Sequence, residues 1–161
     1  MQLGAIDQGT TSTRALMLSA AKAEVCATFT HQQFYPSSGW VEHDPRELLK
    51  NVIACSEALV SADALGLANQ GESCLAWDRK TGQPISPVIV WQDNRTANIT
   101  NKLKKEGHEE RVKALSGLPL DPYFSASKLA WILANVPEAK DLLREKRLAL
   151  GTTDAFFMQN L

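Results

Sequence analysis

The sequence has no long apolar run, no excess of charge of either sign and only three cysteines among its 161 residues. No apolar stretch approaches the roughly 20 residues that a membrane-spanning helix needs, so we expect no membrane insertion. The 17 basic and 18 acidic residues nearly cancel and form no basic stripe, which argues against nucleic acid as a partner. The N-terminus leads straight into a short strand pattern, so we expect no secretory leader.

The cysteines are odd in number, widely spaced and set among apolar residues; they are Cys26, Cys55 and Cys74. This pattern is typical of reduced core cysteines in a cytoplasmic protein and disfavours a disulfide framework or a zinc site. With 44% hydrophobic and 22% charged residues, the chain has the composition of a globular protein that can bury a real core. It therefore fits one domain, or part of a larger protein.

Strand patterns dominate the first part of the chain. An apolar run over 3–6 and a second run from Ala15 flank a polar stretch, and residues 24–33 alternate and are rich in Val, Thr and Phe. Three such segments in succession predict an antiparallel meander. Further apolar runs predict buried strands over 64–68 and 88–91; the first of these resumes over 74–77 after a polar break, and residues 147–150 predict another strand.

Helical patterns occupy most of the remainder. Asp44 as N-cap, Pro45 at the first helical position and Glu47 three residues after the cap predict a helix start. Later helices are predicted over 96–106, 109–116, 127–135 and 138–145 and from 151–154, with Ser125 capping the one over 127–135. This order of elements predicts an α/β or α+β layer structure.

The polar tip of the first hairpin is rich in hydrogen-bonding groups. Gly9 has no Cβ, so a bulky anion can approach the backbone and a positive φ is allowed. The hydroxyls and amides of Thr10, Thr11 and Ser12 suit the oxygens of a phosphate. These residue types are also ordinary at turns, so a plain hairpin turn is the alternative. The stretch is neither a Walker A loop nor a dinucleotide fingerprint.

Two charged residues flank this tip. Asp7 ends the first apolar run, where a carboxylate is suited to hold a hydrated Mg²⁺. Arg14 lies two residues beyond the last hydroxyl of the tip and adds a fixed positive charge whose fork geometry fits phosphate.

Three polar segments, at 7–12, 69–73 and 92–95, each follow an apolar strand run. Ligands of open α/β sheets gather where strands end, so three such segments predict one shared cleft. Glu72, in the second segment, is suited to accept from pairs of substrate hydroxyls; the alternative is a solvated turn acid.

Two aromatic residues and a histidine leave alternatives open. Trp91, at the end of a predicted strand, is either a core residue or a surface that stacks on the carbon skeleton of a substrate. Tyr123 lies in a loop where its hydroxyl can face a ligand. A lone histidine just before a helix is usually structural, and we interpret His43 in that way.

Several motifs occur in one order across essentially the whole chain. They are Asp-Gln-Gly-Thr-Thr-Ser at 7–12, Gly-Trp-Val-Glu-His-Asp-Pro at 39–45, Val-Trp-Gln-Asp at 90–93 and Asp-Pro-Tyr-Phe-Ser at 121–125. Together they resemble the FGGY family of sugar and polyol kinases, most closely its members that phosphorylate glycerol. The resemblance implies an actin-like, ribonuclease-H-like α/β fold of two lobes with ATP and Mg²⁺ between them. Residues 1–161 would form most of the N-terminal lobe, with a mixed sheet and flanking helices.

The resemblance also assigns roles to residues that match the motifs. The implied contacts to the nucleotide phosphates are Thr10, Thr11, Ser12 and Arg14, and Asp7 resembles the carboxylate on the metal side, acting directly or through water. Glu72 and Tyr123 resemble contacts to polyol hydroxyls, and Trp91 resembles the aromatic wall of the polyol site. The family's catalytic aspartate would lie beyond Leu161. Family members are often dimers or tetramers, so a homo-oligomer is one expectation.

One position departs from the family pattern. Members that act on glycerol carry arginine before the glutamate, whereas this chain has Gly71 before Glu72. The missing donors would cost affinity for glycerol, so the substrate is either glycerol or a larger polyol or sugar such as a ketose or tetritol. A non-catalytic, actin-like nucleotide-binding lobe is a third hypothesis.

Overall fold

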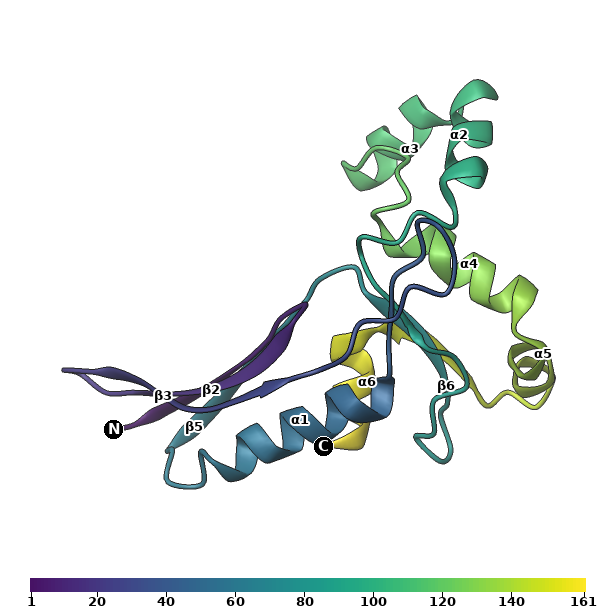
Figure 1. Cartoon of the computed structure of the whole chain (residues 1–161). Coiled ribbons are helices and arrows are strands. Elements are labelled where there is room, and N and C mark those ends of the chain that lie inside the picture. The colour runs from purple at the N-terminus through teal and green to yellow at the C-terminus, as the bar shows by residue number, and fades with distance from the viewer.

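The computed structural model describes residues 1–161 and contains two four-stranded sheets surrounded by six helices (Figure 1). The strand order of the first sheet is β3-β2-β1-β5. Its strands are β1 (Leu3–Gln8), β2 (Ser12–Leu18), β3 (Ala23–Thr30) and β5 (Ala64–Asn69). The predicted meander is confirmed, because β1, β2 and β3 pair antiparallel, and the third strand ends three residues earlier than predicted.

The fourth strand of this sheet makes it mixed. β5 pairs parallel to β1, with Gln8 opposite Asn69, so the two strands end at the same edge of the sheet. The prediction that residues 64–68 form a buried strand is wrong in one respect, since β5 is an edge strand and Leu65 is 46% exposed. The apolar run alone cannot distinguish an edge strand from a central one.

The second sheet is entirely antiparallel and was not expected as a separate sheet. Its order is β4-β7-β6-β8, and its strands are β4 (Glu42–His43), β7 (Val88–Ile89), β6 (Cys74–Asp78) and β8 (Leu148–Thr152). All five residues of β6 are buried, which explains the apolar run of the first four; the fifth, Asp78, pairs with Arg147. The predicted strand over 88–91 ends at Ile89, so Trp91 lies in the loop that follows.

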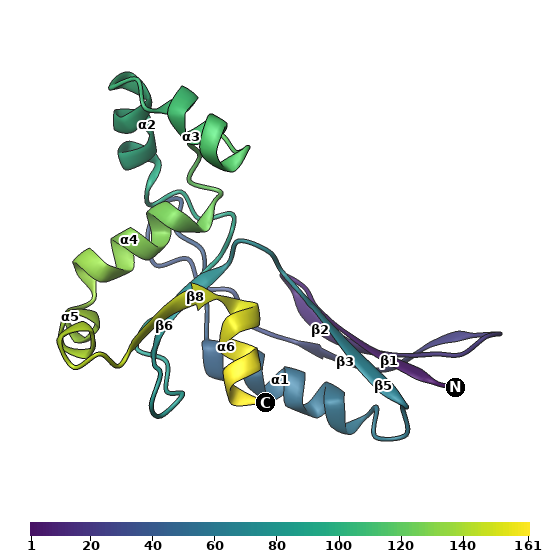
Figure 2. The same cartoon turned by 180° about the vertical axis from the view of Figure 1, so that it is seen from behind.

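Two helices join the sheets through one core. Helix α1 (Pro45–Glu57) begins as predicted, with the Asp44 carboxylate accepting from the amide of Arg46 at 2.8 Å. Helix α6 (Thr153–Asn160) lies beside α1 in both views (Figures 1 and 2). The core that they share with β1, β2, β6 and β7 includes Ile6, Ala15, Leu48, Val52, Trp77, Val88, Phe156 and Phe157.

The other helices lie on the side of the second sheet opposite to α1 and α6 (Figures 1 and 2). They are α2 (Ala97–Lys105), α3 (Glu109–Ser116), α4 (Ser125–Asn135) and α5 (Pro137–Arg144). Helix α4 packs on β6 through a small cluster that contains Ile132, whereas α2 and α3 project away from both sheets (Figure 2). No helix of the chain is both long enough and apolar enough to cross a membrane.

The cysteine prediction is partly wrong. Cys55 and Cys74 are buried, and burial raises the pKa of the Cys74 thiol to about 12. Cys26 is exposed, because it lies on the edge strand β3. All three cysteines are free thiols.

Candidate functional site

The tip of the β1–β2 hairpin is a short loop of exposed and half-buried residues. The amide of Gly9 donates to the carbonyl of Ser12 at 2.9 Å and closes the loop. The imidazole Nε2 of His31, the residue directly after β3, donates to the carbonyl of Thr10 at 2.8 Å and so fixes the loop to the end of β3. Gly9 does not adopt a positive φ, so the loop conformation does not itself require glycine there.

Asp7 and Arg14 lie directly opposite each other on β1 and β2. Both are exposed, and neither side chain forms a hydrogen bond or salt bridge within the chain. Because strand residues in register point to the same face of a sheet, a free carboxylate and a free guanidinium flank the hydroxyl-rich tip. This arrangement leaves both charges available to an external ligand.

Glu72 is held by the first turn of α4. Its Oε2 accepts from the amide of Ser125 at 2.7 Å and also from the Ser125 hydroxyl. Glu72 adopts a left-handed backbone conformation, with φ of 61°, which costs on the order of 1–3 kcal/mol for a residue with a side chain. The helix N-terminus stabilises the carboxylate, and Oε1 forms no hydrogen bond within the chain. Glu72 is therefore not a freely solvated turn acid, because Oε2 is held by Ser125, but its Oε1 remains available to a ligand.

The predicted cap at Ser125 is wrong. Helix α4 starts at Ser125 itself, its N-cap is Phe124, and no side chain of the cap residue contributes a hydrogen bond. The Glu72 carboxylate occupies that capping position instead. A sequence pattern cannot identify a cap that comes from 53 positions away.

Trp91 connects the hairpin tip to the loop after β7. Its indole Nε1 donates to the Thr10 hydroxyl at 3.2 Å, and its backbone amide donates to Ser73 Oγ at 3.1 Å. The rings of Trp91 and Tyr123 lie with their centroids 5.5 Å apart. Trp91 is half-buried and Tyr123 is 43% exposed, so neither residue is enclosed in the core.

The remaining polar segment is structural. Asp93 is fully buried and accepts from Arg95 through both carboxylate oxygens, while Arg95 also donates to Glu42 at 2.7 Å. The Arg95 guanidinium lies 3.8 Å from the centroid of the Trp40 ring and 4.6 Å from that of Trp131. All of these charges are paired internally, so this segment contributes no free charge to the site.

The predicted cleft residues therefore divide into two groups. Thr10, Trp91 and Tyr123 are linked through the contacts described above, and Glu72 is held by Ser125 on α4, whereas the side chains of Asp93 and Arg95 are turned into the protein. Lys128 was missed altogether: it is fully buried on α4 at the helical spacing of Ser125 and Ile132. A lysine on the apolar stripe of a helix was the signal that could have identified it.

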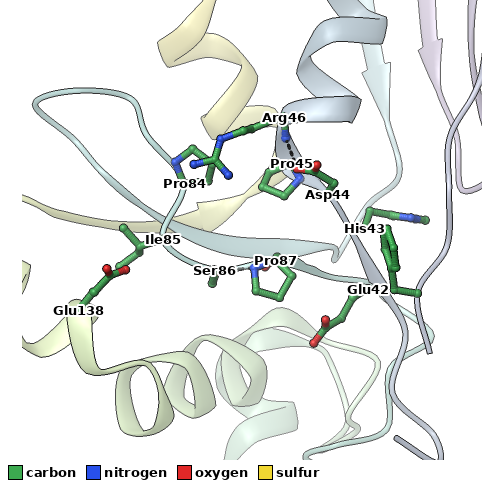
Figure 3. A pocket seen from close by; sticks show the side chains of 11 residues that line it. Glu42, His43, Asp44, Pro45, Arg46, Pro84, Ile85, Ser86, Pro87 and Glu138 are labelled. Carbon is green, nitrogen blue, oxygen red and sulfur yellow. Dashed lines mark hydrogen bonds between the residues drawn. The ribbon is translucent and has the colours of Figure 1, made fainter. Parts of the chain in front are cut away.

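A separate hollow lies away from these residues. Figure 3 shows an open pocket of about 570 Å³ near the start of α1, and none of the predicted site residues lines it. Two of its carboxylates have structural partners, since Asp44 caps α1 and Glu42 pairs with Arg95. The polar groups without a partner, which are the side chains of Arg46 and Glu138 and the Nε2 of His43, lie apart from one another and do not converge on one point (Figure 3).

Comparison with known protein families gives one match over almost the whole chain. The model of the N-terminal domain of the FGGY family of carbohydrate kinases matches residues 2–161. A glycerol kinase of Burkholderia cenocepacia is 46% identical over 165 aligned positions, which cover 97% of this chain and 33% of that protein. The chain thus spans about a third of the length of the curated relatives that it matches.

Solved structures agree with this match. A crystal structure of Plasmodium falciparum glycerol kinase with ADP superposes with a TM-score of 0.86 at 26% identity, covering 99% of this chain and 34% of that one. A gluconate kinase from Lactobacillus acidophilus superposes with a TM-score of 0.81 at 20% identity, covering 98% of this chain and 32% of that one. The fold is that of these kinases, the actin-like ATPase fold.

Proposed function

This chain belongs to the FGGY family of carbohydrate kinases, and we propose that the polypeptide that carries it transfers the terminal phosphoryl group of ATP to a hydroxyl of glycerol or a closely related polyol. The observation that carries the proposal is the direct contact between the two halves of the candidate site. The Trp91 indole, on the proposed polyol side, donates to the Thr10 hydroxyl, on the proposed phosphate side. Such a contact keeps an acceptor and a phosphate within reach of each other.

The hairpin tip is the proposed site for the ATP phosphates. Thr10, Thr11 and Ser12 supply hydroxyls and amides, and the unpaired guanidinium of Arg14 supplies a positive charge on the same face. Phosphoryl transfer depends mainly on positioning and charge stabilisation, which these groups suit.

Asp7 fits a magnesium ion held largely through water. The chain contains no cluster of three His, Cys, Asp or Glu side chains that would enclose a metal. A single exposed carboxylate beside a phosphate loop matches the usual arrangement of Mg²⁺, which keeps several waters and shares phosphate oxygens. When bound, the ion would neutralise phosphate charge during transfer.

Four residues are proposed to bind the polyol. Glu72 retains an unbonded Oε1 that can accept from hydroxyls, and Tyr123 is partly exposed. Trp91 provides an apolar wall for the carbon skeleton. Gly71 borders this group, and a Cβ built there would meet no atom within 4 Å.

No residue of this chain is proposed as the base that removes the proton from the attacking hydroxyl. The family resemblance assigns that role to an aspartate outside residues 1–161. We therefore expect the isolated chain to release no ADP above background when glycerol is added. Glycerol-dependent ADP release by the purified 161-residue chain would contradict this expectation.

The open space at Gly71 favours a second candidate, a kinase for a larger polyol or a ketose. The test is a coupled assay of ADP formation by the complete polypeptide with glycerol, erythritol, xylitol, ribulose and xylulose. The highest kcat/KM for glycerol supports the first candidate. A ten-fold preference for another compound, about 1.4 kcal/mol of discrimination, supports the second. ATP turnover that no member of the panel stimulates would overturn both and favour a non-catalytic nucleotide-binding lobe.

A further inference from the structure

Lys128 is a fully buried lysine that lies beneath the residues proposed to bind the polyol. It lies on the first turn of α4, and its side chain and backbone together have no exposed surface. Burying an ammonium group costs several kcal/mol unless good partners replace water. A methionine of similar length would fill this position without that cost, so the charge calls for a specific explanation.

The partners of Lys128 are backbone carbonyls and not carboxylates. Its Nζ donates to the carbonyl of Tyr123 at 2.7 Å and, more weakly, to that of Val90 at 3.4 Å. No carboxylate lies within 4.0 Å of Nζ, although Glu72 and Asp93 are near enough to act on its charge. Burial lowers the pKa of this lysine below its usual value, and the nearby Cys74, Asp93 and Glu72 partly offset that effect.

The two carbonyls belong to the two walls of the proposed polyol site. Val90 immediately precedes Trp91, and the second carbonyl is that of Tyr123 itself. The two rings lie 5.5 Å apart between centroids. Three residues before Lys128 on the same helix, Ser125 holds the Glu72 carboxylate. The first turn of α4 thus contacts every proposed polyol residue that has a side chain, directly or through the adjoining peptide.

We propose that Lys128 is a positioning residue that fixes the separation and orientation of Trp91 and Tyr123 by tying together the carbonyls of Val90 and Tyr123. The kinetic consequences of this inference depend on the proposed function. Its structural consequences depend only on the observed contacts. Lys128 itself does not touch the substrate.

The structural test uses the 161-residue chain and does not depend on activity. The chain has four tryptophans, so its proton–nitrogen NMR spectrum offers four indole signals. In Lys128→Met, we expect the Trp91 indole signal to shift or broaden, because the loop that carries the ring loses its anchor. The Trp77 indole, which donates to Gln159 Oε1 at 2.6 Å on the other side of the second sheet, is the internal control and should stay in place. An unshifted Trp91 signal in a folded variant would overturn the proposal, as would equal shifts of all four signals.

The kinetic test uses the complete polypeptide. Lys128→Met should raise the KM for the polyol at least ten-fold while the KM for ATP changes less than two-fold. Lys128→Arg, which keeps the charge and the donors, should recover part of that loss, and Lys50→Met, at an exposed position of α1, should change neither constant. A polyol KM within two-fold of the parent value would contradict the proposal. If Lys128→Met does not fold, Lys128→Gln, which retains one donor group, is judged by the same two readouts. An enzyme that phosphorylates no polyol would remove the proposed function and leave the NMR test to decide the positioning role.

Discussion

The Glu72 carboxylate accepts two hydrogen bonds at one oxygen from Ser125, one from its amide and one from its hydroxyl. These bonds fix the rotamer of Glu72 although the residue lies in a turn with a left-handed backbone. The second oxygen remains free and has a defined direction. A group fixed in this way is better suited to binding a small ligand than a mobile turn acid, because little rotational freedom is lost on binding.

Replacement of Glu72 by glutamine should weaken both the helix start and the polyol site. Hydrogen bonds to charged groups contribute about 1.5–3 kcal/mol each, so we expect Glu72→Gln to lower the free energy of unfolding by about 1–2 kcal/mol and to raise the polyol KM ten-fold or more. Urea denaturation and steady-state kinetics measure the two effects. Glu110→Gln, on an exposed residue of α3, is the control. A polyol KM unchanged within two-fold would remove Glu72 from the site.

Introducing arginine at position 71 should favour glycerol. The site is open, and Gly71 does not have a positive φ, so we expect Gly71→Arg to change the free energy of unfolding by less than about 0.5 kcal/mol. The added donors should lower the KM for glycerol about ten-fold relative to larger polyols. Gly66→Arg, on the open edge strand β5, is a matched control that should leave the substrate preference alone. An unaltered ratio of kcat/KM values in Gly71→Arg would show that this position does not set specificity.

The Asp93–Arg95 pair should be important for stability. Both side chains are almost completely buried, and removal of Asp93 leaves the buried Arg95 guanidinium with Glu42 as its remaining carboxylate partner. Breaking a buried ion pair costs about 3–5 kcal/mol when the charge left behind has no other partner, so we expect a loss toward the lower end of that range. We therefore expect Asp93→Asn to lower the urea midpoint strongly. Asp141→Asn breaks the exposed pair with Arg144 and should cost less than about 1 kcal/mol. Equal losses in the two variants would mean that the buried pair is no more valuable than a surface pair.

Stability should decrease in mild acid because of His43. Burial lowers the pKa of His43 from 6.5 to about 4, and its Nδ1 donates to the Gln32 carbonyl at 3.1 Å. Between these two pKa values the unfolded chain binds a proton that the folded chain does not bind. The contribution of His43 to the free energy of unfolding is therefore complete above pH 6.5. It decreases by up to about 3 kcal/mol as the pH falls toward 4.

The His43→Gln variant isolates this effect from that of the carboxylates. Urea denaturation at pH 7.5 and pH 5 should show a smaller loss of stability in the variant than in the parent chain. Parallel losses in both proteins would assign the pH dependence to other groups, of which His31 is one, since burial also lowers its pKa.

Local patterns in the sequence determined much of this domain. Two apolar runs around a polar turn and the alternation over 24–33 predicted the meander, and Asp44 and Pro45 predicted the start of α1. Such features are readable because hairpins and helix caps depend on neighbours within a few positions. The helix over 109–116 has the predicted bounds. The motif order also indicated the family, which the family match confirms.

Tertiary structure alone decided which side chains meet and which charges stay free. Thr10 and Trp91 are 81 positions apart, and Glu72 and Ser125 are 53 apart, so no local periodicity encodes their contacts. Asp7 and Asp93 look alike in the sequence, each at the end of an apolar run. The first is left exposed and unpaired, whereas the second is buried against Arg95, because burial depends on what packs over a residue from distant parts of the chain.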